Sequence, residues 1–221
     1  MIGPDPGQAA RQFTPKLLEW WSKNKQQYSW RKTNDPYRTL VVELLLRKTT
    51  SKQVQRVYDI FIGKYPSSKE LAKAPEKDLE KLLRPLGMEY TRAKLFKRLA
   101  EILVSDFSGH IPRSENDLEK LPGVGRYSVN AVLCMAYGKD VPMVDTNAVR
   151  VVNRVFDFRS SKARAKDDPE IWNFVKGLIP SGKAKEFNLA IIDFAHSICL
   201  PRVPLCPKCP EKSMCEYNLQ K

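Results

Sequence analysis

The 221-residue sequence has no stretch that approaches the roughly 20 apolar residues of a membrane-spanning helix. Its first ten residues lack the basic-then-apolar order of a secretory signal. The absence of both features predicts an intracellular, cytoplasmic protein without a membrane partner. Alternation of apolar and polar residues with a period of two is also nearly absent, which argues against β-sheet structure.

Cysteine is scarce, with five residues, and histidine is scarcer, with two. Because a reducing cytosol keeps thiols free, so few cysteines favour metal ligation over a disulfide framework. The two histidines, His110 and His196, show no metal-ligand spacing. The cysteines are therefore the candidate ligands.

Positive charge is abundant. Lys and Arg outnumber Asp and Glu by 38 to 25, which gives a net charge of +13. Such a field favours a polyanion, and with no membrane segment the expected partner is nucleic acid. A hydrophobic content of 42% is enough to bury a sizeable core.

Apolar residues recur at intervals of three and four along most of the chain. The clearest sets are Val54, Val57, Tyr58, Phe61 and Tyr65, and Phe96, Leu99, Ala100, Leu103 and Phe107. This spacing is typical of amphipathic helices. Turn residues separate the segments. The sequence therefore predicts an all-α fold of about ten helices.

The string LPGVGRY, Leu121 to Tyr127, lies between two expected helices and predicts a helix-hairpin-helix over about residues 118–138. Its two glycines permit backbone conformations closed to other residues and a close approach to a partner. Free N–H groups at the start of the second helix suit a phosphate oxygen. The candidate DNA contacts here are Gly123, Val124, Gly125 and Arg126.

Asp145, in the string VDTN, stands where a helix N-cap belongs, because an apolar-periodic segment follows it. Its structural role there is to cap the helix, which contributes about 1 kcal/mol.

Near the C-terminus, four cysteines follow the pattern C-x6-C-x2-C-x5-C: Cys199, Cys206, Cys209 and Cys215. Four thiolates so close in sequence can surround one compact centre. Zinc knuckles usually pair two CxxC-like hooks, and only one such hook is present. Arg202, in the proline-braced loop after the first cysteine, is a candidate phosphate contact.

The hairpin string, VDTNAVRVVNR and the terminal cysteines together resemble the endonuclease III branch of the helix-hairpin-helix DNA glycosylases, over nearly the whole chain. The resemblance implies that Asp145 supports cleavage of the N-glycosidic bond of a flipped nucleotide. It also implies a [4Fe–4S] cluster on the four cysteines. We expect two helical lobes, residues 35–141 and residues 1–34 with 142–221, and a cleft between them that holds Glu43, Tyr127 and Asp145.

Tyr127 departs from the endonuclease III pattern, which has a lysine at this position. A phenol cannot form a Schiff base with the sugar, so we expect a monofunctional enzyme without strong lyase activity. Tyrosine here is similar to the thymine/uracil mismatch glycosylases of the family, and also to some adenine glycosylases.

The segment Glu43 to Thr50 (ELLLRKTT) is similar to the thymine/uracil mismatch branch, whereas the other branches usually place glutamine in this string. Arg47 and Lys48 match the position of the side chain that fills the space left by the flipped base. Glu43 matches a glutamate that adenine glycosylases use as a general acid.

The resulting prediction is a glycosylase that removes thymine or uracil mispaired with guanine. Its partner would be double-stranded DNA with a mismatched or damaged base, and it would act as a monomer associated with the nucleoid. Three alternatives remain. One is an adenine glycosylase acting opposite oxidised guanine or guanine, although such enzymes have a shorter form of the string Leu86 to Ala93. The others are an endonuclease III-like glycosylase/lyase and a noncatalytic DNA-binding module.

Overall fold

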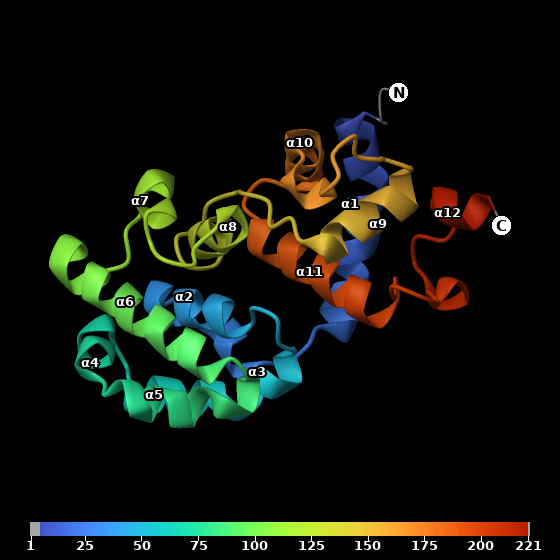
Figure 1. Ribbon diagram of the computed structural model, residues 1–221. Coiled ribbons are helices and arrows are strands. Elements are labelled where there is room, and N and C mark those ends of the chain that lie inside the picture. The colour runs from blue at the N-terminus through green and yellow to red at the C-terminus, as the bar shows by residue number, and fades with distance from the viewer. Residues whose placement is uncertain (1–4, 221) are drawn as a thin grey trace. The chain divides into compact units, whose positions relative to one another are not determined.

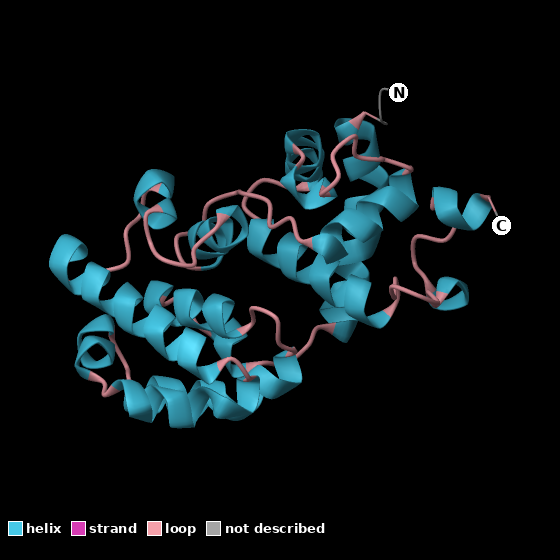
Figure 2. Ribbon diagram, viewed as in Figure 1, coloured by secondary structure: helices cyan, strands magenta, loops and turns pink. Residues whose placement is uncertain are grey.

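The computed structural model describes residues 5–220, which form helices joined by loops (Figure 1). Within these residues there are twelve α-helices, four short 3-10 helices and no strand (Figure 2). The prediction of an all-α fold is confirmed. The chain divides into two compact units: a terminal unit, Met1–Gln26 with Gly138–Lys221, and a middle unit, Gln27–Tyr137.

The middle unit is built around α6. Its elements in chain order are η1 (Ser29–Lys32), α2 (Pro36–Leu45), α3 (Ser51–Lys64), α4 (Ser68–Lys73), α5 (Glu76–Leu83), η2 (Arg84–Leu86), α6 (Glu89–Phe107), α7 (Glu115–Glu119) and α8 (Arg126–Met135). Helix α6 packs against α4 and α5, and α2 packs against α8. The fully buried rings of Phe61 and Phe96 lie 4.9 Å apart between centroids and join α3 to α6. The apolar periodicity noted in the sequence thus marks the core of this unit.

The terminal unit joins the first helix to the C-terminal half of the chain. Its elements are α1 (Pro6–Asn24), α9 (Thr146–Phe156), η3 (Ala165–Asp167), α10 (Pro169–Leu178), α11 (Ala184–Ser197), η4 (Cys206–Lys208) and α12 (Glu216–Leu219). Helix α1 packs against α10 and α11, and α9 packs against α11 and α12. Edge-to-face contacts between Phe13 and Phe156, and between Trp20 and Phe194, fix α1 in this unit.

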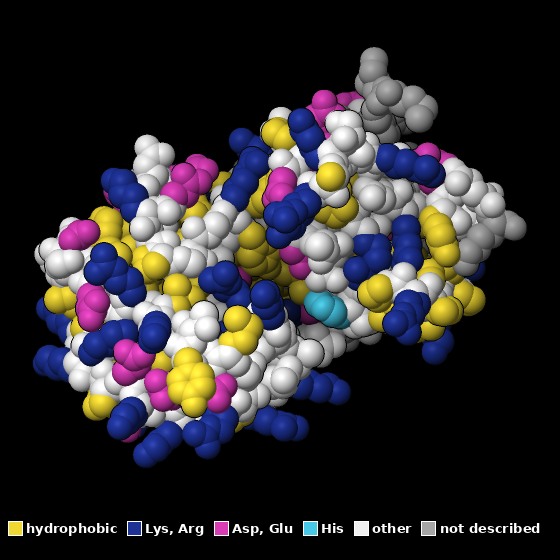
Figure 3. Space-filling view, in the orientation of Figure 1, with side chains coloured by type: hydrophobic (Ala, Val, Ile, Leu, Met, Phe, Trp, Pro, Cys, Tyr) yellow, Lys and Arg dark blue, Asp and Glu magenta, His cyan; other side chains and the backbone are white. Residues whose placement is uncertain are grey.

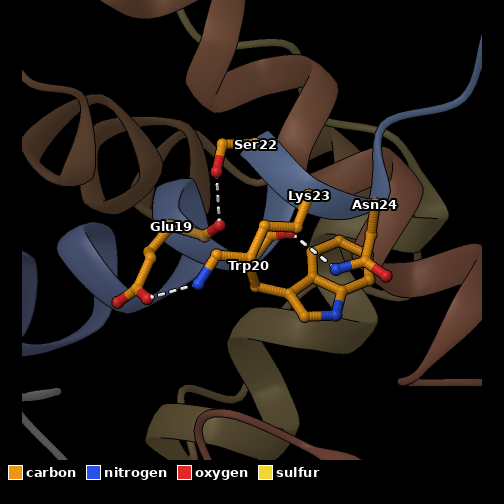
Figure 4. A network of polar contacts seen from close by, with 5 residues as sticks. All are labelled: Glu19, Trp20, Ser22, Lys23 and Asn24. Atoms are coloured by element: carbon orange, nitrogen blue, oxygen red, sulfur yellow. Dashed lines mark hydrogen bonds and ion pairs between the residues drawn. The ribbon is translucent and has the colours of Figure 1, made fainter.

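The last turns of α1 carry a set of local polar contacts (Figure 4). Lys23 pairs with Glu19 at 2.8 Å, and Asn24 Nδ2 donates to the Trp20 carbonyl at 2.8 Å. Because both charged side chains are mostly exposed, the ion pair contributes little to stability. The packing of Trp20 against Phe194 is the stronger anchor of this helix end.

Across residues 5–220, the structure contains no helix that is both long enough and apolar enough to span a membrane.

Candidate active site and cysteine loop

The hairpin turn lies between α7 and α8 of the middle unit. Gly123 has a φ of +77°, and a Cβ built there would lie 2.7 Å from Arg47 Nη1 and 2.9 Å from Leu95 Cδ1. The left-handed backbone therefore favours glycine at this position, and a larger residue would also displace the ends of the Arg47 and Leu95 side chains.

Gly125 differs from Gly123 in both respects. Its φ of −110° and ψ of 177° are extended values that any residue adopts, and a Cβ there would meet nothing within 4 Å. The expectation that both glycines adopt conformations closed to other residues was therefore wrong for Gly125. Its missing side chain instead leaves open space at the N-terminus of α8, where main-chain N–H groups are unpaired within the helix.

The other hairpin residues differ in exposure. Arg126 is exposed and Tyr127 is half-buried in the first turn of α8, while the Val124 side chain is 8% exposed. Because the Val124 side chain is buried, any contact of this residue with DNA would come from its main chain.

Asp145 caps α9 in the terminal unit, as the sequence predicted. Its Oδ1 accepts hydrogen bonds from the N–H groups of Asn147 and Ala148, both at 2.9 Å. Its Oδ2 accepts from Asn147 Nδ2 at 2.6 Å. The carboxylate is therefore oriented by three donors while the residue stays partly exposed.

The chain leading to Asp145 is fixed by a buried amide. Asn188 of α11 is 0% exposed, accepts from the N–H of Met143 at 2.9 Å, and donates to the carbonyl of Val141 at 2.9 Å. These bonds satisfy two main-chain groups of a segment without regular structure. The bonds of Asn188 to the segment before Asp145 and the cap bonds to the helix after it therefore fix the position of this residue.

A continuous series of hydrogen bonds runs from Asp145 to the first cysteine. Asn147 bonds Asp145, and its Oδ1 accepts from Arg150 Nη2 at 3.0 Å. Arg150 Nε in turn donates to the carbonyl of Cys199 at 2.8 Å. Sequence analysis did not select Asn147 or Arg150. Their spacing of three residues indicates that they share one helix face and can bond each other. The sequence does not indicate that Arg150 also contacts the cysteine loop.

The cysteine loop is held to α9 by a second arginine. Arg154 Nη1 donates to the carbonyl of Leu200 at 2.6 Å, and Nη2 donates to that of Pro201 at 2.7 Å. The thiol of Cys215 donates to the Arg154 carbonyl at 3.2 Å. Two arginines of one helix therefore satisfy the loop's main chain at several points.

The four thiols influence one another electrostatically. Burial, with smaller contributions from Cys215 and Cys199, raises the pKa of the Cys209 thiol to about 12. Burial also raises the pKa of Cys215, with Cys199 and Cys206 acting in the same direction. The thiolate forms thus disfavour one another in the absence of a cation. In the described part of the chain, no group of three or more Cys, His, Asp or Glu side chains has the arrangement that holds a metal ion.

Glu211, within the same loop, is a residue that sequence analysis missed. It is 0% exposed, and neither carboxyl oxygen has a hydrogen-bond partner among the described residues. Burial raises its pKa to about 8, although the charge of Lys16 acts in the opposite direction. Burial therefore favours the protonated form of this carboxyl, and when ionised its charge raises the pKa of Cys209.

The remaining predicted site residues lie on exposed or half-buried positions. Glu43 is half-buried on α2, Arg47 and Lys48 are exposed in the loop after α2, and Arg202 is exposed in the cysteine loop. Arg47 Nη1 donates to the Gly123 carbonyl at 3.3 Å, so the structure joins this loop to the hairpin. Glu43 and Tyr127 belong to the middle unit and Asp145 to the terminal unit. Their meeting in one cleft stays a prediction.

Comparison with known proteins agrees with these features. Residues 41–176 match the family described as HhH-GPD superfamily base excision DNA repair protein. The chain belongs to this superfamily, and its assignment to the helix-hairpin-helix glycosylases is confirmed.

Two similar relatives carry the name thymine/uracil-DNA glycosylase. The one from Pyrobaculum aerophilum is 43% identical, over 90% of this chain and 87% of the relative. The one from Methanothermobacter thermautotrophicus is 38% identical, over 93% and 92%. A solved structure of a thermostable thymine-DNA glycosylase matches with a TM-score of 0.92 and 36% identity, over 97% of this chain and 98% of the other.

Proposed function

We propose that this chain is a monofunctional DNA glycosylase that hydrolyses the N-glycosidic bond of thymine or uracil mispaired with guanine. The observation that carries the proposal is its similarity to thymine/uracil-DNA glycosylases along nearly the full length of both chains. Such an enzyme would work on chromosomal DNA in the cytoplasm, as a monomer.

Asp145 is the proposed catalytic carboxylate. Departure of a base leaves positive, oxocarbenium-like charge on the sugar, and a nearby carboxylate stabilises that charge or activates the attacking water. The three donors that orient Asp145 restrict its rotation. Since the reacting atom is inaccessible in a stacked duplex, the nucleotide would be flipped out first.

Tyr127 and Glu43 are proposed to line the site of the flipped nucleotide. Tyr127 has no amine with which to form an imine, so strand cleavage by β-elimination would be absent or weak. Glu43 could exchange a proton with the departing base, because it matches a glutamate that adenine glycosylases use as a general acid and lies half-buried on α2.

The proposed DNA contacts lie on both units. Main-chain N–H groups at the start of α8, with Arg126, would bind the phosphate backbone. Lys48 would occupy the space of the flipped base, and Arg202 would contact phosphate from the cysteine loop. Lys and Arg side chains are spread over the visible surface of each unit (Figure 3), and their positive charge favours binding to a polyanion.

We infer that Cys199, Cys206, Cys209 and Cys215 hold a [4Fe–4S] cluster. A single tetrahedral metal ion would bring the four sulfurs to about 3.8 Å from one another, given metal–sulfur bonds of about 2.3 Å. A four-iron cluster binds each thiolate through a different iron and so suits a wider set of sulfurs. The donor set fits, because burial and the neighbouring thiols raise the pKa values of Cys209 and Cys215, and a bound cationic iron centre would stabilise their thiolate forms. When bound, the cluster would cross-link the loop.

A glycosylase panel tests the proposal. The protein is incubated with duplexes containing T·G, U·G or adenine opposite oxidised guanine, each with and without alkali. We expect release of thymine and uracil, with strand breaks only after alkali. Release of adenine alone would refute the substrate assignment, and strand breaks without alkali would refute the monofunctional mechanism. Iron content and visible absorbance of the purified protein test the cluster; bound zinc would contradict it.

A further inference from the structure

Arg92 of α6 is a buried cation that sequence analysis did not select. It is 6% exposed, and its guanidinium donates to carbonyls of two different loops. Nε donates to Gly87 at 2.9 Å, and Nη2 donates to Arg47 at 2.5 Å. Nη1 donates to Leu44 at 3.1 Å and to Leu45 at 3.3 Å.

Leu44 and Leu45 are the last two residues of α2, where carbonyls have no partner within the helix and the helix dipole is negative. The Leu45 carbonyl also accepts from Thr49 Oγ1 at 2.5 Å, so Arg92 and a residue of the following loop cap this helix end together. Each loop also contains a residue with positive φ beside an Arg92 acceptor, Lys48 at 55° and Met88 at 54°. Arg92 thus stabilises two loops that ordinary backbone preferences would not hold.

Burial of this arginine carries a free-energy penalty. Burial lowers the pKa of Arg92, and the positive charge of Arg47 lowers it further. Its recorded acceptors are neutral carbonyls, not carboxylates. An apolar residue would fit the buried face of an amphipathic helix without this penalty. The placement of the two loops is the compensating gain.

Arg47 extends the assembly to the hairpin. Its main-chain carbonyl is held by Arg92, and its side chain donates to the Gly123 carbonyl at 3.3 Å. One donor of the Arg47 guanidinium is therefore used within the protein, although the side chain is exposed. Lys48, the next residue, is exposed, and within residues 5–220 its side chain has no hydrogen bond or ion pair.

We propose that Arg92 and Arg47 are positioning residues that fix loop 46–50 against the hairpin, so that Lys48, and not Arg47, is the cation presented to the flipped-base site. This inference rests on the proposed glycosylase function. Its structural part, the control of the loop by Arg92, does not require that function.

The structural part is tested without DNA, by hydrogen–deuterium exchange of the folded protein. Arg92→Met should speed exchange at the amides of residues 46–50 and 87–90, because their carbonyl anchor is lost. The matched control is Arg98→Met, which removes an exposed positive charge from the same helix. Exchange in Arg92→Met equal to that of the control would overturn the proposal. Arg92→Lys retains the charge and should give intermediate exchange, which provides a test should the methionine variant fold poorly.

The functional part is tested by a double-mutant cycle in single-turnover base release from a T·G duplex. We expect Arg92→Met and Arg47→Met each to lower the rate by about 10- to 100-fold, as misplacement of a group near the chemistry does. In a Lys48→Ala background, either change should lower the rate by less than about threefold more. Arg92→Lys should recover part of the rate. Independent, multiplicative effects of positions 92 and 48 would overturn the proposal.

Failure of this inference and failure of the proposed function are distinguishable. If the unmodified protein releases no base from any duplex, the glycosylase assignment and the role of Lys48 fall together. The exchange experiment would still show whether Arg92 holds the loop.

Discussion

Both units use arginine to hold main-chain carbonyls outside regular helices, but the surroundings differ. In the middle unit, Arg92 is buried and holds the end of α2 together with a neighbouring turn. In the terminal unit, Arg150 and Arg154 are less buried and hold the cysteine loop, whose thiols disfavour one another's ionised forms. The proposed cluster, if bound, would therefore stabilise the loop of the terminal unit in a way that Arg150 and Arg154 alone do not.

Under the proposed function, most of the DNA contacts belong to the middle unit, whereas the catalytic carboxylate, with Arg202, belongs to the terminal unit. Substitutions in the two units should then separate binding from chemistry.

The largest expected effect is that of Asp145→Asn. Loss of the carboxylate should lower single-turnover base release by about 100-fold or more, because stabilisation of charge in the transition state is removed. Binding of a mismatched duplex, measured by fluorescence anisotropy, should change little, since the amide can still accept the N-cap hydrogen bonds. Normal base release by this variant would contradict the claim that the terminal unit supplies the catalytic carboxylate.

Gly123→Ala should weaken DNA binding by about tenfold, because a Cβ at positive φ strains the turn by about 1–3 kcal/mol and displaces Arg47. Gly125→Ala is the matched control for folding, since its backbone is extended and the space is open. Thermal unfolding should show a lower Tm for the first variant only. Equal Tm values for the two variants would contradict the assignment of strain.

Arg150→Met should lower base release by about tenfold, because it breaks the series of hydrogen bonds between Cys199 and Asp145. Arg154→Met removes comparable loop contacts without touching Asn147, so its rate should remain closer to that of the unmodified protein. Single-turnover rates normalised to iron content compare the two. Equal losses of rate in the two variants would mean that the cysteine loop affects base release through its overall stability and not through the hydrogen bonds that lead to Asp145.

The smallest expected effect is a gain of function in Tyr127→Lys. An amine beside the sugar would form some Schiff base, detected as borohydride-dependent trapping of the protein on DNA. Tyr127→Phe is the matched control and should not be trapped. If trapping is absent although the lysine variant still binds DNA, Tyr127 does not lie beside the sugar.

The longer helices and the Asp145 cap could be predicted because their signals are local. The spacing from Val54 to Phe61 marks α3, and the position of Asp145 before an apolar-periodic segment marks the start of α9. Helices of four to six residues, such as α4, α7 and α12, are too short to show a period and could not be identified in this way.

Arg92, Arg150 and Glu211 could not be selected from the sequence for a different reason. In a sequence, a charged residue in an amphipathic helix or a polar loop is expected at the surface. These residues are buried or half-buried only because segments distant in sequence pack against them. The roles of Asp145, Tyr127 and the cysteines follow from motifs, whereas the residues that position them follow from tertiary contacts.

The backbone at Lys48 has an evolutionary consequence. Glycine or asparagine would adopt its φ of 55° more easily than lysine. A library randomised at this position and selected only for heat resistance should therefore drift toward those two residues. Selection for repair in living cells should instead retain a long, positively charged side chain.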